Sequence, residues 1–247
     1  MSLVSAELYL ETDRYVLQLA QTEAEVWAAQ RLRFQVFNIE LQEGLAESHA
    51  LERDQDRFDA VCDHLLVTEK SSGEVVGTYR MQTGESAGRN LGYYSATEFD
   101  FTPFESARRD ILELGRACIA DGHRNQSVLG LLWKGIARYA KFHGARYLVG
   151  CSSITSQDAA GGLATYRQLA KRCEVAEPWR TLPLAGWRCG EVEGRPLKVP
   201  KLMAAYLALG ARICGEPALD REFGTIVFLT WLDLESLPLR VLRKYLS

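Results

Sequence analysis

The hydrophobic pattern of the N-terminal part predicts a strand, a helix and then a hairpin. The first strand covers residues 15–20 (YVLQLA), and Thr22 caps a helix over 23–41. Arg33 falls beside the buried stripe of that helix, either as a snorkelling side chain covering apolar surface or as one partner of an ion pair. The hairpin joins strands at 64–68 (HLLVT) and 74–82 (EVVGTYRMQ) through Ser71-Ser72-Gly73.

The stretch 110–154 has the clearest pattern and organises the rest of the chain. A strand carrying Glu113 and Arg116 leads into a polar loop and an amphipathic helix, which Gly144 ends, and a buried strand follows over 145–154. On the polar face of the helix lie Lys134, Arg138 and Lys141. This face is either simply solvated or a docking surface for an acidic partner.

The C-terminal part alternates less regularly. The pattern predicts helices over 158–173 and 200–211, the second begun by Pro200, and a closing hydrophobic strand over 224–233. Residues 84–90 and 179–199 are expected to be loops, the latter with at most one short strand. The basic amphipathic end at 237–246 suits a packed terminal helix or contact with anionic lipid.

These elements predict an α/β (α+β) fold in which helices flank a mixed central sheet. The length of 247 residues suits one domain, 1–247, with an elaborated C-terminal part from about residue 155. The aromatic stretch 91–101 (LGYYSATEFDF) is expected to be irregular or partly helical. Its rings suit either core packing or a groove for an acyl chain.

Composition narrows the class of function. A net charge of −3 gives no general electrostatic reason to bind nucleic acid. The six cysteines form no C-x-x-C pair and no zinc spacing with histidines, so we expect reduced thiols and no metal. The first 20 residues lack a signal-peptide pattern, and no apolar run approaches the ~20 residues of a membrane span. We expect a cytoplasmic protein, with peripheral contact at the inner membrane face as an additional candidate.

Acidic residues are concentrated between 40 and 59, directly before the strand at 64–68. Such runs are usually solvated loops. Here the run places Asp56 and Asp59 near the mouth of the predicted sheet, where they could hold a cationic ligand. Arg80, in a strand of alternating faces, points either to solvent or into a cleft.

The motifs of nucleotide chemistry are missing from the sequence. There is no P-loop and no G-x-G-x-x-G, and no cysteine is placed with a histidine in a nucleophile signature. Charged residues on predicted adjacent strands, followed by a loop at a helix N-terminus, suit an anionic or thioester ligand. They favour direct transfer between two bound substrates, in which proximity supplies much of the rate and a carboxylate removes a proton.

Several stretches resemble the GNAT acyltransferases, and in particular the acyl-carrier-protein-dependent N-acyltransferases. In that branch are the L-ornithine N-alpha-acyltransferases of ornithine-lipid synthesis, the N-acyl amino acid synthases and the acyl-homoserine-lactone synthases. The similar stretches are RFQVFNIEL (Arg33, Glu40), DQDRFDAVCDHLLV (Asp56, Asp59), VVGTYRM (Arg80) and ELGRACI (Glu113, Arg116). The stretch 200–233 is similar to a region of the ornithine acyltransferases that the lactone synthases lack.

The resemblance implies aminolysis of an acyl thioester. Glu113 is then the candidate base, and strand amides with Arg116 are the candidate oxyanion stabilisers. The implied substrate-binding residues are Arg33, Glu40, Asp56, Asp59 and Arg80. For each charged residue the structural alternative is an ion pair that closes the acidic loop over the sheet.

The donor loop departs from the pattern of ordinary GNAT enzymes. The expected donor-binding residues are His123, Arg124, Asn125, Gln126, Ser127 and Val128, in a loop (HRNQSVLG) whose single glycine is Gly130. Without the usual glycines the backbone cannot wrap a pyrophosphate closely. This favours acyl-phosphopantetheine on an acyl carrier protein as donor, with acyl-CoA as the alternative, and no bound cofactor.

The resemblance leads to a first hypothesis, transfer of a (3-hydroxy)fatty acyl group to the alpha-amine of ornithine, which would give a lyso-ornithine lipid. The alternatives are an N-acyl amino acid synthase or another amine acceptor, then a lactone synthase. From a different class, the chain could be a non-catalytic acyl-carrier or lipid-binding module.

Overall fold

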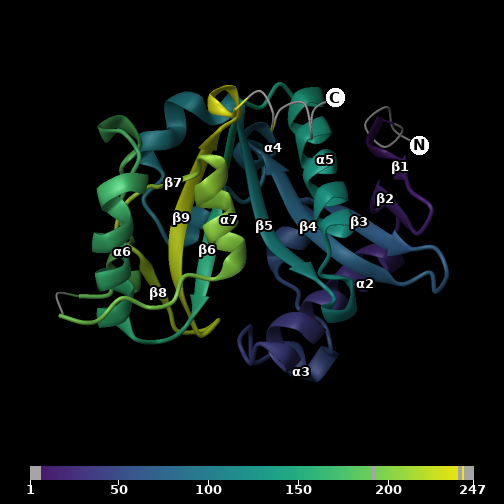
Figure 1. Cartoon of the computed structure of the whole chain (residues 1–247), viewed down its shortest axis with the longest axis horizontal. Coiled ribbons are helices and arrows are strands. Elements are labelled where there is room, and N and C mark those ends of the chain that lie inside the picture. Colours follow the sequence, from purple (N-terminus) through teal and green to yellow (C-terminus); the bar gives the residue numbers. More distant parts are fainter. Residues whose placement is uncertain (1–6, 191–192, 239–240, 242–247) are drawn as a thin grey trace.

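The computed structural model describes residues 7–190, 193–238 and 241, and within them the strands form one mixed sheet (Figure 1). The strand order is β1-β2-β3-β4-β5-β6-β9-β7, with β8 also paired to β9. Neighbouring strands are antiparallel except β5 and β6, which are parallel. The bounds are β1 (Leu10–Glu11), β2 (Tyr15–Leu19), β3 (Asp63–Glu69), β4 (Val75–Thr83), β5 (Ile111–Ile119), β6 (Tyr147–Thr155), β7 (Arg212–Ile213), β8 (Ala218–Asp220) and β9 (Thr225–Asp233). The predicted mixed sheet is confirmed.

Helix α2 (Glu23–Phe34) begins as the sequence predicts. The Thr22 side chain accepts from the Glu25 amide, and the Glu25 carboxylate accepts from the Thr22 amide, which completes a capping box. The helix continues into a π-helical segment, Gln35–Glu40. Its wider turn carries the chain away from the sheet into the acidic stretch, which holds α3 (Ser48–Leu51) and a 3₁₀ turn at Arg57–Ala60.

Helix α5 (Gln126–Phe142) covers one face of β2, β3 and β4, and α2 packs against β3, β4 and β5 from the opposite face (Figure 1). The buried side of α5 includes Leu132 and Ile136 in the main core cluster. Gly135 lies on that same side, and the position needs glycine because a Cβ there would come within 2.8–2.9 Å of the Leu65 and Leu17 side chains. As predicted, Gly144 follows the helix in a left-handed conformation.

The C-terminal part builds the other half of the sheet. Helix α6 (Ala159–Cys173) is capped by the Asp158 side chain, and α7 (Lys201–Leu209) follows Pro200. Both helices contribute to a core cluster against β9, α6 through Leu163 and α7 through Met203. Figure 1 shows α7 in front of β6 and β9, beside the point where β5 and β6 separate. No helix within the described residues is long and apolar enough to cross a membrane.

One prediction about local structure needs correction. Residues 84–90 are not a loop, because α4 (Gly84–Arg89) forms there with Thr83 as its cap. The segment 179–199 is mostly loop within its described residues, as predicted, and it includes the 3₁₀ turn Ala185–Trp187. The short strands β1, β7 and β8 carry too few residues to show a period and were missed. Most of the predicted tail, 239–240 and 242–247, lies outside the described residues.

Candidate active site

The site is organised by the separation of two parallel strands. Strands β5 and β6 pair only from Ile111↔Tyr147 to Glu113↔Val149, and beyond this point they diverge (Figure 1). At the point of divergence a Cβ on Gly150 would lie 2.2 Å from the Leu114 carbonyl oxygen. Any side chain at position 150 would therefore push the strands apart. A cavity of about 350 Å³ opens between the diverging halves.

A bulge in β5 faces this opening. The register with β4 steps from Gly115 opposite Arg80 to Cys118 opposite Thr78, so that β5 holds one extra residue. Arg116 takes up the bend with a φ of 48°, a left-handed conformation that is rare for residues other than glycine. The bulge interrupts the pairing of β5 with β4, and its residues Gly115, Arg116 and Ala117 line the cavity.

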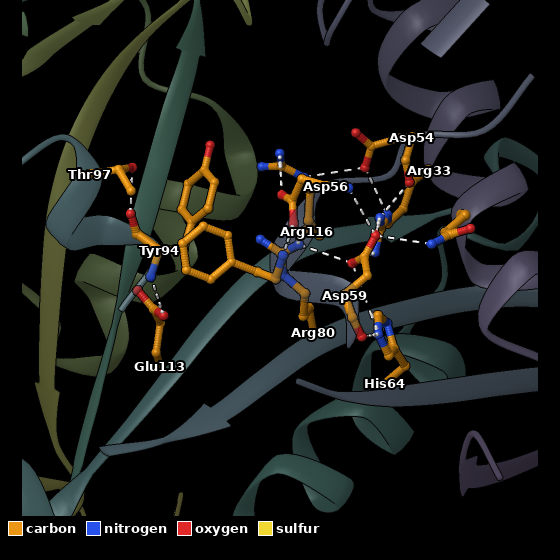
Figure 2. Close-up of polar contacts among 12 residues, drawn as sticks. Arg33, Asp54, Asp56, Asp59, His64, Arg80, Tyr94, Thr97, Glu113 and Arg116 are labelled. Carbon is orange, nitrogen blue, oxygen red and sulfur yellow. Dashed lines mark hydrogen bonds and ion pairs between the residues drawn. The ribbon is translucent and has the colours of Figure 1, made fainter. Parts of the chain in front are cut away.

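Beside the cavity lies an Arg–Asp network, which we define as Arg33, Asp54, Asp56, Asp59, Arg80 and Arg116 (Figure 2). Arg33 is 0% exposed and donates to Asp54 Oδ2 at 2.7 Å and to both Asp59 oxygens at 2.8 and 3.0 Å. Arg80 Nη1 donates to Asp56 and Asp59 at 2.6 and 3.0 Å. Arg116 reaches Asp56 at 3.1 Å and lies 3.2 Å from Asp54. Three arginines meet three aspartates, so the network is balanced in charge.

The arginine charges keep Asp56 and Asp59 of this network ionised. Burial raises the pKa of the Asp59 carboxyl, but the charges of Arg33 and Arg80 outweigh it and hold that pKa well below its usual range. Arg80 and Arg116 likewise outweigh burial and lower the pKa of Asp56. Of the network residues, Arg80 and Arg116 line the cavity, whereas Arg33, Asp56 and Asp59 do not. Four of the five predicted substrate-binding residues, all but Glu40, are thus brought together, and two of the network arginines line the cavity.

Glu113 lies at the last position of β5 that pairs with β6, and it lines the cavity. Its two carboxylate oxygens accept the backbone amides of Tyr94 and Ser95 at 2.9 and 2.8 Å. Burial raises its pKa, and the amides partly offset that effect. Figure 2 shows Glu113 apart from the Arg–Asp network. Tyr94 links the two, because the Arg116 guanidinium lies 4.8 Å from the centre of its ring.

The predicted donor loop lies at the N-terminus of α5. The Asn125 side chain caps the helix and accepts the amides of Ser127 and Val128 at 3.0 and 3.1 Å. Val128 is buried in the core, whereas Gln126 and Ser127 are exposed. His123 Nδ1 lies 3.1 Å from the Tyr15 hydroxyl. None of the six predicted donor residues lines the cavity between β5 and β6.

Glu40 lies with the donor loop and not with the other predicted acceptor residues. Its carboxylate contacts Arg124 at 2.5 Å, and Arg124 also reaches Asp121 at 3.1 Å. This ion pair joins the end of the π-helical segment to the start of α5. Glu40 does not line the cavity.

Three carboxylates of the cavity wall were missed by sequence reasoning: Glu43, Glu98 and Asp220. Glu98 lies in the aromatic stretch 91–101 and is 1% exposed. An acid inside an aromatic segment was a signal that something must hold its charge, but the segment also carries Asp100, so the sequence does not single out Glu98. Asp220 ends β8, a strand too short to predict, and Glu43 was counted only as part of the acidic run.

The rest of the cavity is apolar or carries thiols. Its apolar part includes Met81, Trp133, Leu148 and Met203, and the Tyr79 and Tyr206 hydroxyls hydrogen-bond there between β4 and α7. The thiols of Cys62 and Cys151 also line the cavity. Burial raises the pKa of Cys62 to about 12 and that of Cys151 well above its usual value. Both thiols are therefore protonated at neutral pH and are poor nucleophiles.

All six cysteines are free, as the sequence predicts. Among the described residues no group of three His, Cys, Asp or Glu side chains is arranged to hold a metal ion.

Comparison with known proteins places the fold. Residues 32–134 match the acetyltransferase (GNAT) domain family. An N-acyl amino acid synthase from uncultured soil microbes superposes with a TM-score of 0.55 at 12% identity, over 91% of this chain and 94% of that one. A CoA-dependent acyl-homoserine lactone synthase superposes with a TM-score of 0.51 at 15% identity, over 90% and 82%. The molecule is a GNAT-fold acyltransferase.

Sequence relatives define the family more narrowly. An L-ornithine N(alpha)-acyltransferase of Brucella abortus is 33% identical over 93% of this chain and 88% of its own length. The enzyme of the same name from Agrobacterium fabrum is 32% identical over 92% and 84%. The chain therefore belongs to the L-ornithine N(alpha)-acyltransferase family. The resemblance drawn from the short motifs is confirmed.

Proposed function

We propose that the protein transfers a fatty acyl group from acyl carrier protein to the alpha-amine of ornithine and so forms a lyso-ornithine lipid. The observation that carries this proposal is the two-sided cavity between β5 and β6. Its apolar part, with Met81, Leu148 and Met203, suits an acyl chain, and its polar part presents Glu113, Arg80 and Arg116. A cavity of this kind brings a thioester and a charged amino acid together at the opening of the strands.

The reaction is aminolysis. The neutral alpha-amine attacks the thioester carbonyl carbon, the new C–N bond forms, and the C–S bond breaks to release the phosphopantetheine thiol. The amine proton passes to Glu113, directly or through water, and the thiolate takes up a proton. Burial raises the pKa of Glu113, which makes its carboxylate a stronger base than an exposed glutamate.

Residues of β4 and β5 suit the remaining roles, which are stabilising the oxyanion and binding the substrate carboxylate. Backbone amides of the bulge at Arg116, whose residues line the cavity, are the proposed donors to the thioester oxyanion, and the Arg116 charge supports them. Arg80 and Arg116 are the proposed partners of the substrate carboxylate. Arg33, Asp56 and Asp59 act on the substrate indirectly, because they hold these two arginines in place.

The donor loop supports acyl carrier protein over CoA. In α5 the first amides that could face a pyrophosphate, those of Ser127 and Val128, are already bonded to Asn125. A phosphopantetheine arm carries one phosphate and no nucleotide, so it needs fewer free backbone amides at this helix terminus than a pyrophosphate does. The exposed Lys134 and Lys141 on α5 lie on the same helix as this terminus and offer positive charge to an acidic carrier.

The test is product formation with purified protein and a choice of donors. Incubation with ornithine and 3-hydroxyacyl carrier protein should give N-acyl ornithine by mass spectrometry, and the acyl-CoA of the same chain should react more slowly. A clear preference for short-chain CoA would overturn the donor assignment. Acylation of an amine other than ornithine would show that the acceptor assignment is wrong. Donor binding without any product would indicate a binding module.

A further inference from the structure

The carboxylates of Glu43, Glu98 and Asp220 form a group on the cavity wall that the mechanism above does not use; we call it the acidic wall. Glu98 is 1% and Asp220 4% exposed, and Glu43 is partly buried. None of the three forms an ion pair with Lys, Arg or His within residues 7–190, 193–238 and 241. Buried carboxylates are normally paired with a cation, so the acidic wall is incomplete as it stands.

The contacts that the acidic wall makes are to neutral groups. Asp220 Oδ1 accepts the amides of Phe223 and Glu222 at 2.8 and 3.0 Å, and Glu43 accepts the Thr155 hydroxyl at 2.7 Å. The Cys151 thiol lies 3.8 Å from Glu98 Oε2. These bonds orient the carboxylates, and none of these hydrogen-bond partners carries a positive charge.

A second observation in the same cavity points to a ligand. Thr225, paired with Asp220 across β8 and β9, lines the cavity, is 1% exposed, and its hydroxyl has no hydrogen-bond partner among the described residues. An unpartnered buried hydroxyl is costly unless something completes it. A primary ammonium carries three N–H donors, which suits two carboxylates and one hydroxyl together.

The acidic wall lies close to the proposed catalytic carboxylate. Ser95 donates its amide to Glu113 at 2.8 Å, and its hydroxyl lies 3.4 Å from the Cys151 thiol, which in turn contacts Glu98. Two small side chains thus separate Glu113 from Glu98. That spacing suits one substrate that carries an amine at each end of a short chain.

We propose that Glu98 and Asp220, assisted by Glu43 and the Thr225 hydroxyl, bind the side-chain ammonium of a diamino acid acceptor. This assignment rests on the proposed function and adds to it the residues that select a second amine. Glu113 would receive the proton of the reacting alpha-amine while the acidic wall holds the charged far end. Acceptors without a side-chain cation would leave the acidic wall unpaired and be rejected.

The test compares ornithine with norvaline, which has the same carbon chain and no side-chain amine. With one acyl donor throughout, wild type should show kcat/KM at least 100-fold higher for ornithine. Glu98→Gln and Asp220→Asn should each lower that ornithine-to-norvaline ratio at least tenfold. Glu216→Gln is the matched control, because Glu216 is an exposed acid four residues from Asp220 and outside the cavity lining, and it should leave the ratio unchanged.

The pH dependence of the same ratio gives an independent readout. Burial and the neighbouring charge of Asp220 raise the pKa of Glu98 to about 8. The groups whose charge or hydrogen bonds act on Glu98 are Asp220, Arg116, Tyr94 and Glu113, and Cys151 contacts it. As pH rises through about 8, Glu98 loses its proton and gains the charge that attracts an ammonium, so the ratio should rise. Ionisation of the alpha-amine does not depend on Glu98, so the variant separates the two effects: in Glu98→Gln the rise should disappear.

Each outcome decides between defined alternatives. Equal use of ornithine and norvaline by wild type would overturn the acidic wall and leave ornithine acylation standing. Acylation of neither substrate would overturn the proposed function itself. If Glu98→Gln keeps a cooperative thermal transition but lowers kcat/KM equally for both acceptors, the residue has a general structural role and the inference is wrong.

Discussion

Two groups of buried charges lie side by side in this molecule and differ in one respect. In the Arg–Asp network each aspartate meets an arginine at 2.6–3.2 Å. In the acidic wall the carboxylates meet amides, a hydroxyl and a thiol. The pKa values follow: they lie below their usual range for Asp56 and Asp59, and above it for Glu43, Glu98 and Asp220. A buried charge that already has its partner supports the fold, whereas one without a partner is ready for a ligand.

Arg116 joins the two groups. Its guanidinium contacts Asp54 and Asp56 in the network, and its charge lowers the pKa of Glu98 and Asp220 without forming an ion pair with either. The strained backbone at this residue places it at the bulge between the two groups. The network therefore fixes the position of the cation nearest to the acidic wall.

The largest effect should follow from a change on the cavity side that spares the network. Glu113→Gln removes the proposed base, and because general bases contribute about 10²–10⁴-fold, kcat should fall by that factor. Donor binding should persist, measured by titration with acyl carrier protein. The melting temperature is the control, since a Gln oxygen can still accept one of the two amides that Glu113 accepts. Product formation at the wild-type rate would remove Glu113 from the mechanism.

The next effect should fall on stability and should come from the network side. Arg33→Met leaves Asp59 with only Arg80 and Asp54 with only Arg116. Removing one partner of a buried ion pair costs about 3–5 kcal/mol. Urea unfolding followed by circular dichroism measures the loss.

Arg14→Met is the matched control for this substitution. It breaks an ion pair with Glu69 in which the arginine side chain is 60% exposed, so the unfolding midpoint should hardly move. Equal losses in the two variants would show that the network does not support the fold.

The last effect should be a difference in the pH dependence of stability, with opposite signs for the two groups. Glu98 has a pKa of about 8 in the folded protein, against about 4.3 when unfolded. Between these values the folded state holds a proton that the unfolded state has released, so the unfolding free energy should fall as pH rises from 5 to 8. For Asp56 and Asp59 the folded pKa is the lower one, so their contribution is lost only in acid, below about pH 3.9.

Glu98→Gln isolates the contribution of the acidic wall. Urea unfolding at pH 5 and pH 8 should show a smaller decline in the variant than in wild type, while the acid unfolding that depends on Asp56 and Asp59 should be unchanged. A decline of the same size in both proteins would mean that Glu98 does not hold the extra proton.

Much of the fold follows from local patterns in the sequence. Thr22 caps its helix, α5 buries the side on which Leu132 and Ile136 recur, and Gly144 ends it, because caps and periodic faces depend only on neighbours along the chain. Arg33 was placed beside a buried stripe for the same reason, and it is fully buried. The family could also be predicted from the short motifs, since their order along the chain is itself a property of the sequence.

What only the tertiary structure decided is which charges find partners. Asp54, Asp56 and Asp59 lie 21–62 residues from Arg80 and Arg116, and their pairing depends on the acidic stretch folding back over β4 and β5. Glu98 and Asp220 meet at the cavity because β8 pairs with β9. A strand of three residues is too short for the sequence to predict that pairing. Burial and pairing are long-range properties, so the sequence determined which residues carry charge, and the fold determined which of those charges remain open to a substrate.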